Sequence, residues 1–267
     1  MPSSPSKSPA SQIAFEMRGQ VALIRLARPT KRNAMNDALI ADLRASITSL
    51  PDTAKVAVIH GEGEHFSAGL DLSELRERDV VEGMYHSRMW HEALDKIQFG
   101  RVPVIAALHG AVIGGGLELA CVAHLRVADE TAFYGLPEGQ RGIFVGGGGS
   151  VRIPRLIGVA RMTDLMMTGR VYDATEGHTA GISQYLVPAG QALVKALEIA
   201  ERVCGNAPLT NYALMHVLPR INEQGMDQGL ITESMIAAIA QSSPEAKKRL
   251  RDFLEGRAEK VKPTDAD

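Results

Sequence analysis

Two glutamates, Glu118 and Glu138, have the setting in this 267-residue chain that best suits acid–base chemistry. Glu118 falls in the first turn of an expected apolar helix, where a carboxylate is costly unless it is paired or used. Glu138 follows Pro137 and precedes a glycine-rich loop. Two carboxylates at one cleft can have pKa values that are pushed apart, so that one acts as a base and the other as an acid.

Two glycine turns predict backbone groups that could bind an anion. Gly69 lets the chain turn sharply, and such a turn can point the N–H of Leu70 into a cleft. Glycines at 114–116 precede the helix that carries Glu118, and the first N–H groups of a helix have no internal partner. Each turn alone is more typical of an ordinary loop. Together with the two glutamates, they indicate a cleft that could stabilise an oxyanion.

The elements that must position these residues mix strands and helices. Alternating or continuous apolar residues predict a hairpin over 13–26 and further strands at 56–59, 104–108, 125–128, 131–134 and 184–187. Helical spacing predicts helices at 39–50, 81–98, 117–123, 190–204, 209–223, 226–240 and 244–256. We therefore expect an α/β fold of strand–strand–helix units, followed by a region that is nearly all helix.

Composition and charge exclude several classes of protein. The net charge of −2 gives no reason to expect a nucleic-acid or membrane partner. The two cysteines and eight histidines have no metal-ligand spacing, and no dinucleotide, phosphate-loop or serine-hydrolase motif occurs. The Ser/Pro-rich start lacks the apolar core of a secretory signal. These features predict a cytoplasmic protein with no bound metal and a disordered tail over residues 1–11.

Several short segments together resemble the crotonase superfamily of enoyl-CoA hydratases and isomerases. The resemblance covers residues 12–257, and the segments are RNAMN at 32–36, FSAGLD at 66–71, PVIAA at 103–107, GAVIGGGLELA at 110–120, LPE at 136–138 and DFLE at 252–255. It implies a crotonase-like spiral of ββα units over residues 12–200 and a helical trimerisation region over 201–267. It also implies a homotrimer or a hexamer built from two trimers.

The resemblance further implies an acyl-CoA thioester ligand and no separate cofactor. The thioester oxygen would lie between the N–H groups of Leu70 and Gly115. The other residues implied to contact the substrate or CoA are Lys31, Arg32, Ala34, Ser67, Ala68, Asp71, Leu72, Gly114 and Phe253. Hydratases of this family carry two glutamates, so the resemblance implies an enoyl-CoA hydratase with Glu118 as base and Glu138 as acid.

The chain departs from this family in the loop after Glu138. Arg141 and Phe144 are unexpected there, and Val145 replaces a proline. Trp90 lies in the helix that usually lines the acyl pocket. These departures suit a specialised substrate, such as methylthioacryloyl-CoA or an aromatic acyl-CoA. The alternatives are an enoyl-CoA isomerase or an acyl-CoA hydrolase on the same fold, and a non-catalytic or RNA-binding relative.

Overall fold

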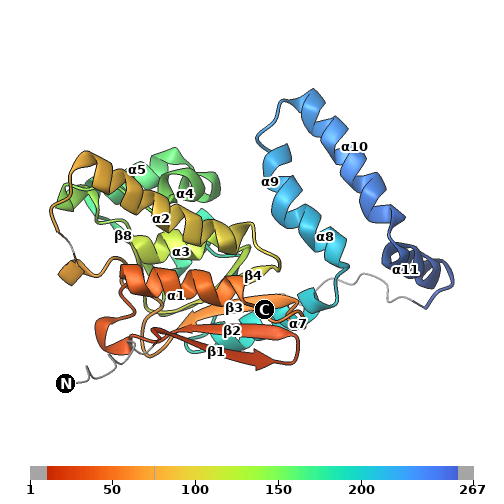
Figure 1. Cartoon of the computed structure of the whole chain (residues 1–267), viewed down its shortest axis with the longest axis horizontal. Coiled ribbons are helices and arrows are strands. Elements are labelled where there is room, and N and C mark those ends of the chain that lie inside the picture. The colour runs from red at the N-terminus through yellow and green to blue at the C-terminus, as the bar shows by residue number, and fades with distance from the viewer. Residues whose placement is uncertain (1–10, 75, 258–267) are drawn as a thin grey trace, which may run out of the picture.

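The computed structural model describes residues 11–74 and 76–257 (Figure 1). Its larger sheet has the strand order β1-β2-β3-β4-β6-β9. The strands are β1 (Ile13–Arg18), β2 (Val21–Leu26), β3 (Val56–Gly61), β4 (Val104–Leu108), β6 (Leu125–Asp129) and β9 (Tyr185–Val187). β1 and β2 form the predicted antiparallel hairpin, and every later pairing in this sheet is parallel. A three-stranded sheet adds β5 (Ala111–Ile113), β7 (Phe133–Gly135) and β8 (Val171–Tyr172).

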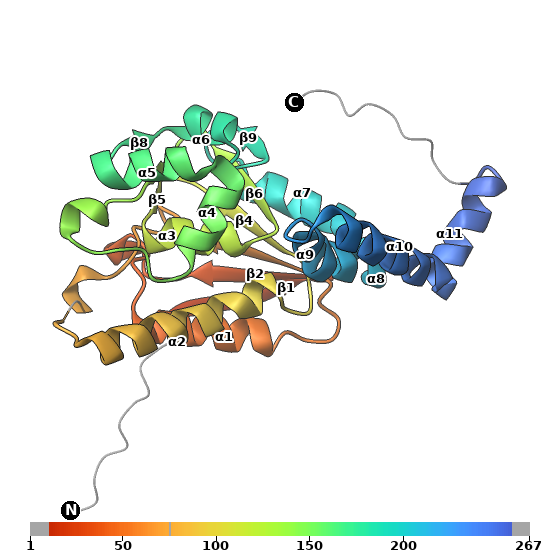
Figure 2. The same cartoon turned by 90° about the horizontal axis from the view of Figure 1, so that it is seen from above.

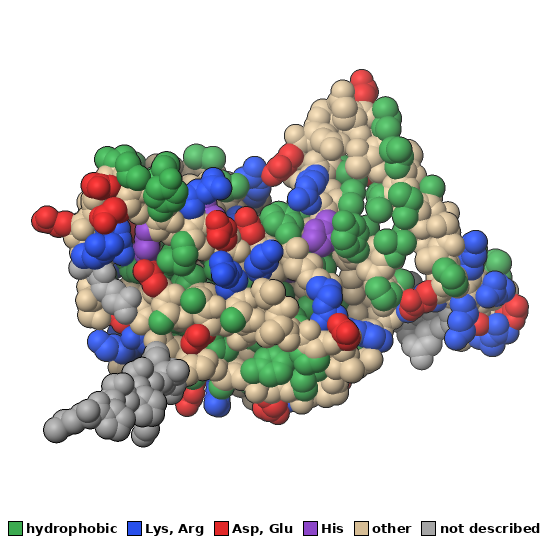
Figure 3. Space-filling model, in the orientation of Figure 1, with side chains coloured by type: hydrophobic (Ala, Val, Ile, Leu, Met, Phe, Trp, Pro, Cys, Tyr) green, Lys and Arg blue, Asp and Glu red, His purple; other side chains and the backbone are tan. Residues whose placement is uncertain are grey.

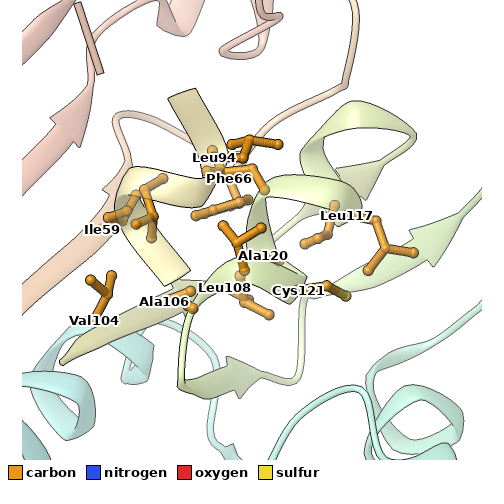
Figure 4. Close-up of a cluster of buried hydrophobic side chains, with 14 of the residues drawn as sticks. Ile59, Phe66, Leu94, Val104, Ala106, Leu108, Leu117, Ala120 and Cys121 are labelled. Carbon is orange, nitrogen blue, oxygen red and sulfur yellow. The ribbon is translucent and has the colours of Figure 1, made fainter. Parts of the chain in front are cut away.

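Alternate residues of the large sheet face two different hydrophobic clusters. Ala22 and Ile24 of β2 pack into the cluster shared with α1 (Asp37–Thr48), α2 (Val80–Gln98) and α3 (Gly115–Val122). Leu23 points to the other face, which is covered by α7 (Ala192–Cys204). Figure 4 shows the first cluster, where Phe66 and Leu94 lie close to side chains from β4 and α3. The period of two along the strands thus separates two cores and fixes the sheet between helical layers.

Helix ends agree with local sequence signals. The side chain of Asn36 accepts a hydrogen bond from the N–H of Leu39 at 2.9 Å and caps α1. Asp79 caps α2 in the same way through the N–H of Glu82 at 2.8 Å. Capping oxygens satisfy N–H groups that a helix leaves unpaired, so these residues fix where both helices begin.

Several short elements differ from the predicted pattern or were missed by it. The strand predicted at 131–134 begins later, because the backbone N–H and hydroxyl of Thr131 form a turn with Asp129 Oδ1 at 2.9 and 2.5 Å. Sequence reasoning missed β5, β8, α4 (Gly149–Ile157), α5 (Val159–Thr168) and α6 (Ala174–Ala180). The helix predicted at 209–223 is divided into α8 (Pro208–Tyr212), a π-helical turn (Ala213–Val217) and α9 (Leu218–Ile221). Pro219 lacks the N–H that a regular α-helix needs there.

The C-terminal helices form an arm outside the two sheets. α8 and α9 lead to α10 (Met226–Ser242) and α11 (Pro244–Leu254), which project away from the sheets in Figures 1 and 2. The predicted α/β class with a C-terminal helical region is therefore confirmed. The predicted domain limits at residues 12, 200 and 201 stay a prediction, and nearly all of the predicted N-terminal tail lies outside the described residues.

Candidate active site

The largest concentration of predicted site residues surrounds a cavity of about 390 Å³. Its walls come from the start of α3, the loop before α2, one face of α2 and the segment that follows β7. The lining includes Ala68, Leu70, Leu72, Gly114, Gly115, Glu118 and Glu138. Residues that are 70 positions apart in the sequence therefore meet at one site.

Glu118 is held by backbone amides at the start of α4. Its Oε1 accepts hydrogen bonds from the N–H groups of Gly147 at 2.8 Å and Gly149 at 2.7 Å. The side chain is 4% exposed, as expected for a helix that is buried along its whole length. Burial raises the pKa of Glu118, while the two amides and the charge of Arg152 oppose that rise. The N–H of Gly146 also lowers this pKa, so the amides of the loop before α4 face the carboxylate, which borders the cavity.

Glu138 faces the same cavity from the segment after β7. It is buried, and its Oε2 has no hydrogen-bond partner among the described residues. Its Oε1 lies 2.6 Å from the position that a Cβ would take on Gly114. Burial raises the pKa of Glu138, and the nearby charge of Glu118 raises it further, whereas Arg141 lowers it. The two glutamates therefore form an electrostatically coupled pair.

Two backbone amides beside the glutamates have the arrangement expected for oxyanion binding. Gly69 has a φ of 86°, and a Cβ built on it would lie 2.5 Å from the carbonyl oxygen of Ile113 and 3.3 Å from the N of Gly115. Only glycine permits this backbone conformation and this close approach. The N–H of Leu70 donates to no backbone oxygen within residues 11–74 and 76–257. Gly115 is the first residue of α3, so its N–H has no partner inside the helix.

The loop that carries Leu70 is fixed by a partly buried ion pair. Arg28 Nη2 contacts Asp71 Oδ2 at 2.8 Å, and the Ser73 hydroxyl donates to Asp71 Oδ1 at 2.6 Å. The hydrogen bonds from Ser73 and Arg28 lower the pKa of Asp71 to about 2. Arg28 also donates to the carbonyl of Ala34. Asp71 thus holds the turn in place, and its carboxylate is occupied by protein groups.

Residues 31–36 are joined to the same turn by backbone hydrogen bonds. The N–H of Ala68 donates to the carbonyl of Arg32 at 2.9 Å, and Met35 donates to the carbonyl of Gly69 at 2.7 Å. Asn33, with a φ of 52°, is fully buried, and its side-chain amide donates to the carbonyls of Glu62 and His65. Sequence reasoning did not single out Asn33 or Arg28, although both lie in or beside a quoted motif.

Not every predicted substrate contact lies on the cavity. Lys31 and Arg32 are exposed beside the turn. Ala34 and Ser67 are buried, and the Ser67 hydroxyl donates to the carbonyl of Asn33 at 2.8 Å. Phe253 is 62% exposed on α11, in the arm that leaves the sheets (Figure 2). Within one chain, the structure therefore brings Phe253 to neither the cavity nor the turn.

One face of α2 forms a wall of the cavity that sequence reasoning recognised only at Trp90. Gly83, His86, Ser87 and Trp90 all line it, at the spacing of a single helical face. The Ser87 hydroxyl donates to the carbonyl of Gly146 at 2.6 Å, and His86 Nε2 lies 2.7 Å from Asp37 Oδ1. The same helix thus shapes the cavity and contacts the loop whose amides bind Glu118.

The described residues contain neither a metal-binding cluster nor a membrane-spanning helix. No group of three or more His, Cys, Asp or Glu side chains within the described residues could hold a metal ion. No helix among them is long and apolar enough to cross a membrane. The expectation that no metal or cofactor is bound stays a prediction.

Comparison with known proteins agrees with this geometry. The family model for enoyl-CoA hydratase/isomerase matches residues 16–263. The 2,3-dehydroadipyl-CoA hydratase of Escherichia coli K12 is 30% identical over 251 residues, which cover 92% of this chain and 97% of that protein. The chain belongs to the enoyl-CoA hydratase/isomerase family, the crotonase superfamily, and is an enzyme of the hydro-lyase type.

Solved structures of the same family share the whole fold. One from Rhodopseudomonas palustris CGA009, which carries an enoyl-CoA hydratase assignment, is 59% identical with a TM-score of 0.91. The match covers 95% of this chain and 98% of the chain in that structure. The enoyl-CoA hydratase from Bacillus anthracis is 30% identical with a TM-score of 0.86, covering 92% and 97% of the two chains.

Proposed function

We propose that this chain adds water across the 2,3 double bond of an unsaturated acyl-CoA thioester, with Glu118 and Glu138 as the catalytic residues. The observation that carries the proposal is the meeting of two buried glutamates and two oxyanion-type amides at one cavity. The family resemblance implies that most isomerases and hydrolases on this fold replace at least one of the two glutamates, so the pair favours hydration over these alternatives. The net charge of −2 gives no support to the RNA-binding alternative.

In the proposed mechanism, the ionised Glu118 and the protonated Glu138 bind one water molecule, and the raised pKa of Glu138 favours its protonated form. Glu118 accepts a proton from this water as its oxygen attacks the β-carbon of the substrate. The negative charge that develops on the thioester oxygen is stabilised by the N–H groups of Leu70 and Gly115, an effect typically worth about 3 kcal/mol for each donor. Glu138 then delivers its own proton to the α-carbon. The atoms balance, because the hydroxyl of water is added to the β-carbon and the proton that Glu118 took from water passes to Glu138, which restores both side chains for the next turnover.

The remaining substrate contacts are part of the same proposal. Ala68, Leu72 and Gly114 would lie along the pantetheine and acyl groups, with Lys31, Arg32 and Ala34 nearer to the nucleotide. Ser67 and Asp71 would act through the turn that they hold. Methylthioacryloyl-CoA stays a candidate for a specialised substrate. The relative from Escherichia coli suggests a second kind, because the name 2,3-dehydroadipyl-CoA hydratase specifies a substrate with a terminal carboxylate.

An absorbance assay tests the reaction. Loss of the conjugated enoyl-thioester absorbance from crotonyl-CoA, without release of free thiol, is expected for hydration. Glu118→Gln and Glu138→Gln are each expected to lower kcat by roughly 10²–10⁴-fold. Solvent deuterium separates their roles, because Glu138→Gln should lose exchange of the α-proton. Thiol release as the main activity, or normal exchange in Glu138→Gln, would contradict the proposed roles.

We also propose that the enzyme is a homotrimer or a hexamer of two trimers, located in the cytoplasm. Hydrophobic side chains are exposed along the arm formed by α8 to α11 (Figure 3). On α10, the exposed residues Ile231, Met235 and Ile239 repeat every four positions and so share one face. Contact with a second subunit would bury this face. It would also allow Phe253 of one subunit to approach the CoA bound to another.

A further inference from the structure

The cavity has a direction that α2 defines. Trp90 marks its reacting end, because the Trp90 ring carbon Cζ3 lies 3.2 Å from the Cβ position of Gly115, whose amide is proposed to bind the thioester oxygen. Gly83 lies on the same face of α2, seven residues toward the start of the helix. This separation corresponds to about 10 Å along the helix axis. An acyl group that extends from the thioester along α2 therefore ends near Gly83 and the residues before the helix.

Arg78 provides a cation at that far end. Arg78 lines the cavity just before the cap of α2, is half-buried, and makes no ion pair with the described residues. Arg76, two positions earlier, is instead exposed and contacts Glu82 at 3.7 Å. Among the described residues, the acidic side chains that line the cavity are Glu118 and Glu138, both near the reacting end. Neither of these two compensates the charge of Arg78.

A second arginine lines the cavity from the opposite wall. Arg141 lies three residues after Glu138 in a short 3-10 helix (Gly139–Arg141), and its charge acts on Glu138. It too forms no side-chain ion pair within the described residues. The lining around the two arginines is apolar, with Leu72, Ile143 and Phe144. The cavity is thus apolar along its length and has cationic groups at its far end and side. Such a cavity fits a substrate acyl chain that is apolar in the middle and anionic at its end.

We infer that the substrate is an enoyl-CoA whose acyl chain ends in a carboxylate, which Arg78 binds with support from Arg141. This inference rests on the proposed hydration reaction and specifies its substrate class. Guanidinium groups bind carboxylates through paired, charge-assisted hydrogen bonds. The carboxylate must lie several carbons from the thioester, because Gly83 is about two helical turns from Trp90 and Arg78 lies beyond it, before the helix begins. A short uncharged acyl group such as methylthioacryloyl would leave Arg78 without a contact.

The test compares two substrates of equal length, 2-hexenedioyl-CoA and its ω-methyl ester, which lacks the terminal charge. The unmodified enzyme is expected to hydrate the free acid with a kcat/KM at least tenfold higher than the ester. Arg78→Gln should reduce this preference by tenfold or more, chiefly by raising KM for the acid, and leave the ester unaffected. Arg78→Lys, which keeps the charge but not the planar group, should retain part of the preference.

Gly83 allows a complementary variant. A Cβ built on Gly83 meets nothing within 4 Å, so a side chain there enters open space at the cavity wall. Gly83→Glu should therefore repel the free acid and lower its kcat/KM well below that of the ester. Arg76→Gln is the matched control and should change neither substrate, because Arg76 does not line the cavity.

The outcomes separate this inference from the proposed function. Equal kcat/KM values for acid and ester in the unmodified enzyme would overturn it, as would an equal loss for both substrates in Arg78→Gln. The second result would assign Arg78 to the CoA portion, which the two substrates share. Hydration of crotonyl-CoA tests the reaction itself. An enzyme that hydrates crotonyl-CoA but does not distinguish acid from ester refutes only the inference.

Discussion

The amide of Gly149 donates to Glu118 Oε1 over 2.7 Å and so joins the first residue of α4 to a carboxylate on α3. The N-terminal end of a helix carries partial positive charge, which favours the ionised form of an acid placed there. Burial of Glu118 favours the neutral form instead. The balance leaves an ionisable base with one oxygen held by the protein.

We expect Gly149→Ala to damage catalysis more than stability. A Cβ on Gly149 would lie 2.8 Å from both Cγ and Oε1 of Glu118 and would displace the carboxylate. Small displacements of a catalytic group can cost about 10²-fold in rate, and overpacking costs about 1–3 kcal/mol. Steady-state kinetics with crotonyl-CoA and thermal unfolding measure the two effects. Gly229→Ala on α10 is the control, since a Cβ there meets its nearest atom at 3.5 Å. An unchanged kcat in Gly149→Ala would show that this contact does not position the base.

The coupling between the glutamates should be measurable by titration. The charge of Glu118 raises the pKa of Glu138, so Glu118→Gln should lower the pKa of Glu138 toward its ordinary value of 4.5. The measurement is NMR of glutamate labelled with ¹³C at the carboxyl carbon, assigned with Glu138→Gln. In the unmodified enzyme, the raised pKa values predict an acid limb of kcat/KM above the range of an ordinary glutamate. A Glu138 pKa that does not move in Glu118→Gln would exclude the coupling.

Glu138→Gln should stabilise the protein at alkaline pH. The folded pKa of Glu138 is raised above its unfolded value of 4.5, so the native state favours the protonated form. That stabilisation is fully present below the unfolded pKa and is lost as the pH rises through the folded pKa. A neutral glutamine avoids this loss. The melting temperature of the Glu138→Gln variant should therefore exceed that of the unmodified protein at pH 8 but not at pH 4. An equal rise in melting temperature at pH 8 and at pH 4 would show that the effect comes from packing and not from charge.

Asp71→Asn should destabilise the protein at neutral pH. Its pH dependence should have the opposite sign to that of Glu138, because the pKa of Asp71 is lowered and not raised. Bonds from Ser73 and Arg28 lower the pKa of Asp71 from 3.8 to about 2. This stabilisation is present above the unfolded pKa and is lost as the pH falls through about 2. The shift corresponds to about 2 kcal/mol at pH 7, measurable by urea unfolding at pH 7 and pH 3. Asp52→Asn, in an exposed turn, is the control. Equal costs at both pH values would show that the charge of Asp71 is not what matters.

The exposed face of α10 should control assembly. Met235→Glu places a charge in the centre of the stripe formed by Ile231, Met235 and Ile239. Burial of that charge in a subunit interface would be unfavourable, so sedimentation velocity should detect smaller species than the trimer or hexamer of the unmodified protein. Glu233→Gln, at another exposed position of the same helix, should leave assembly unchanged. A monomeric unmodified protein would contradict the proposed oligomer.

Much of the fold follows from local sequence pattern, and the missed elements have physical reasons. The hairpin of β1 and β2 and the start of α1 have clear alternation and a capping residue. β5 has only three residues between Gly110 and Gly114, too few to show a period. α4 begins at Gly149 and contains Pro154, two residues that weaken any helical signal.

The catalytic candidates were predictable by residue type, but their supports were not. Glu118 is conspicuous as the single charge of an apolar helix. Its partners are amides of Gly147 and Gly149, and a backbone amide leaves no signature in side-chain type. The pairing of Arg28 with Asp71 joins residues 43 positions apart. The role proposed for Arg78 could be inferred only after the structure showed how α2 runs along the cavity. Such relationships depend on tertiary structure.

The use of main-chain groups to bind Glu118 has a consequence for how this enzyme can evolve. No single amino-acid replacement deletes an amide N–H except one to proline. Arg141, Ile143 and Phe144 can therefore be exchanged one at a time while the groups that bind the base persist. Substitutions in the lining can therefore change the acyl specificity of the cavity while the backbone groups that bind Glu118 remain in place.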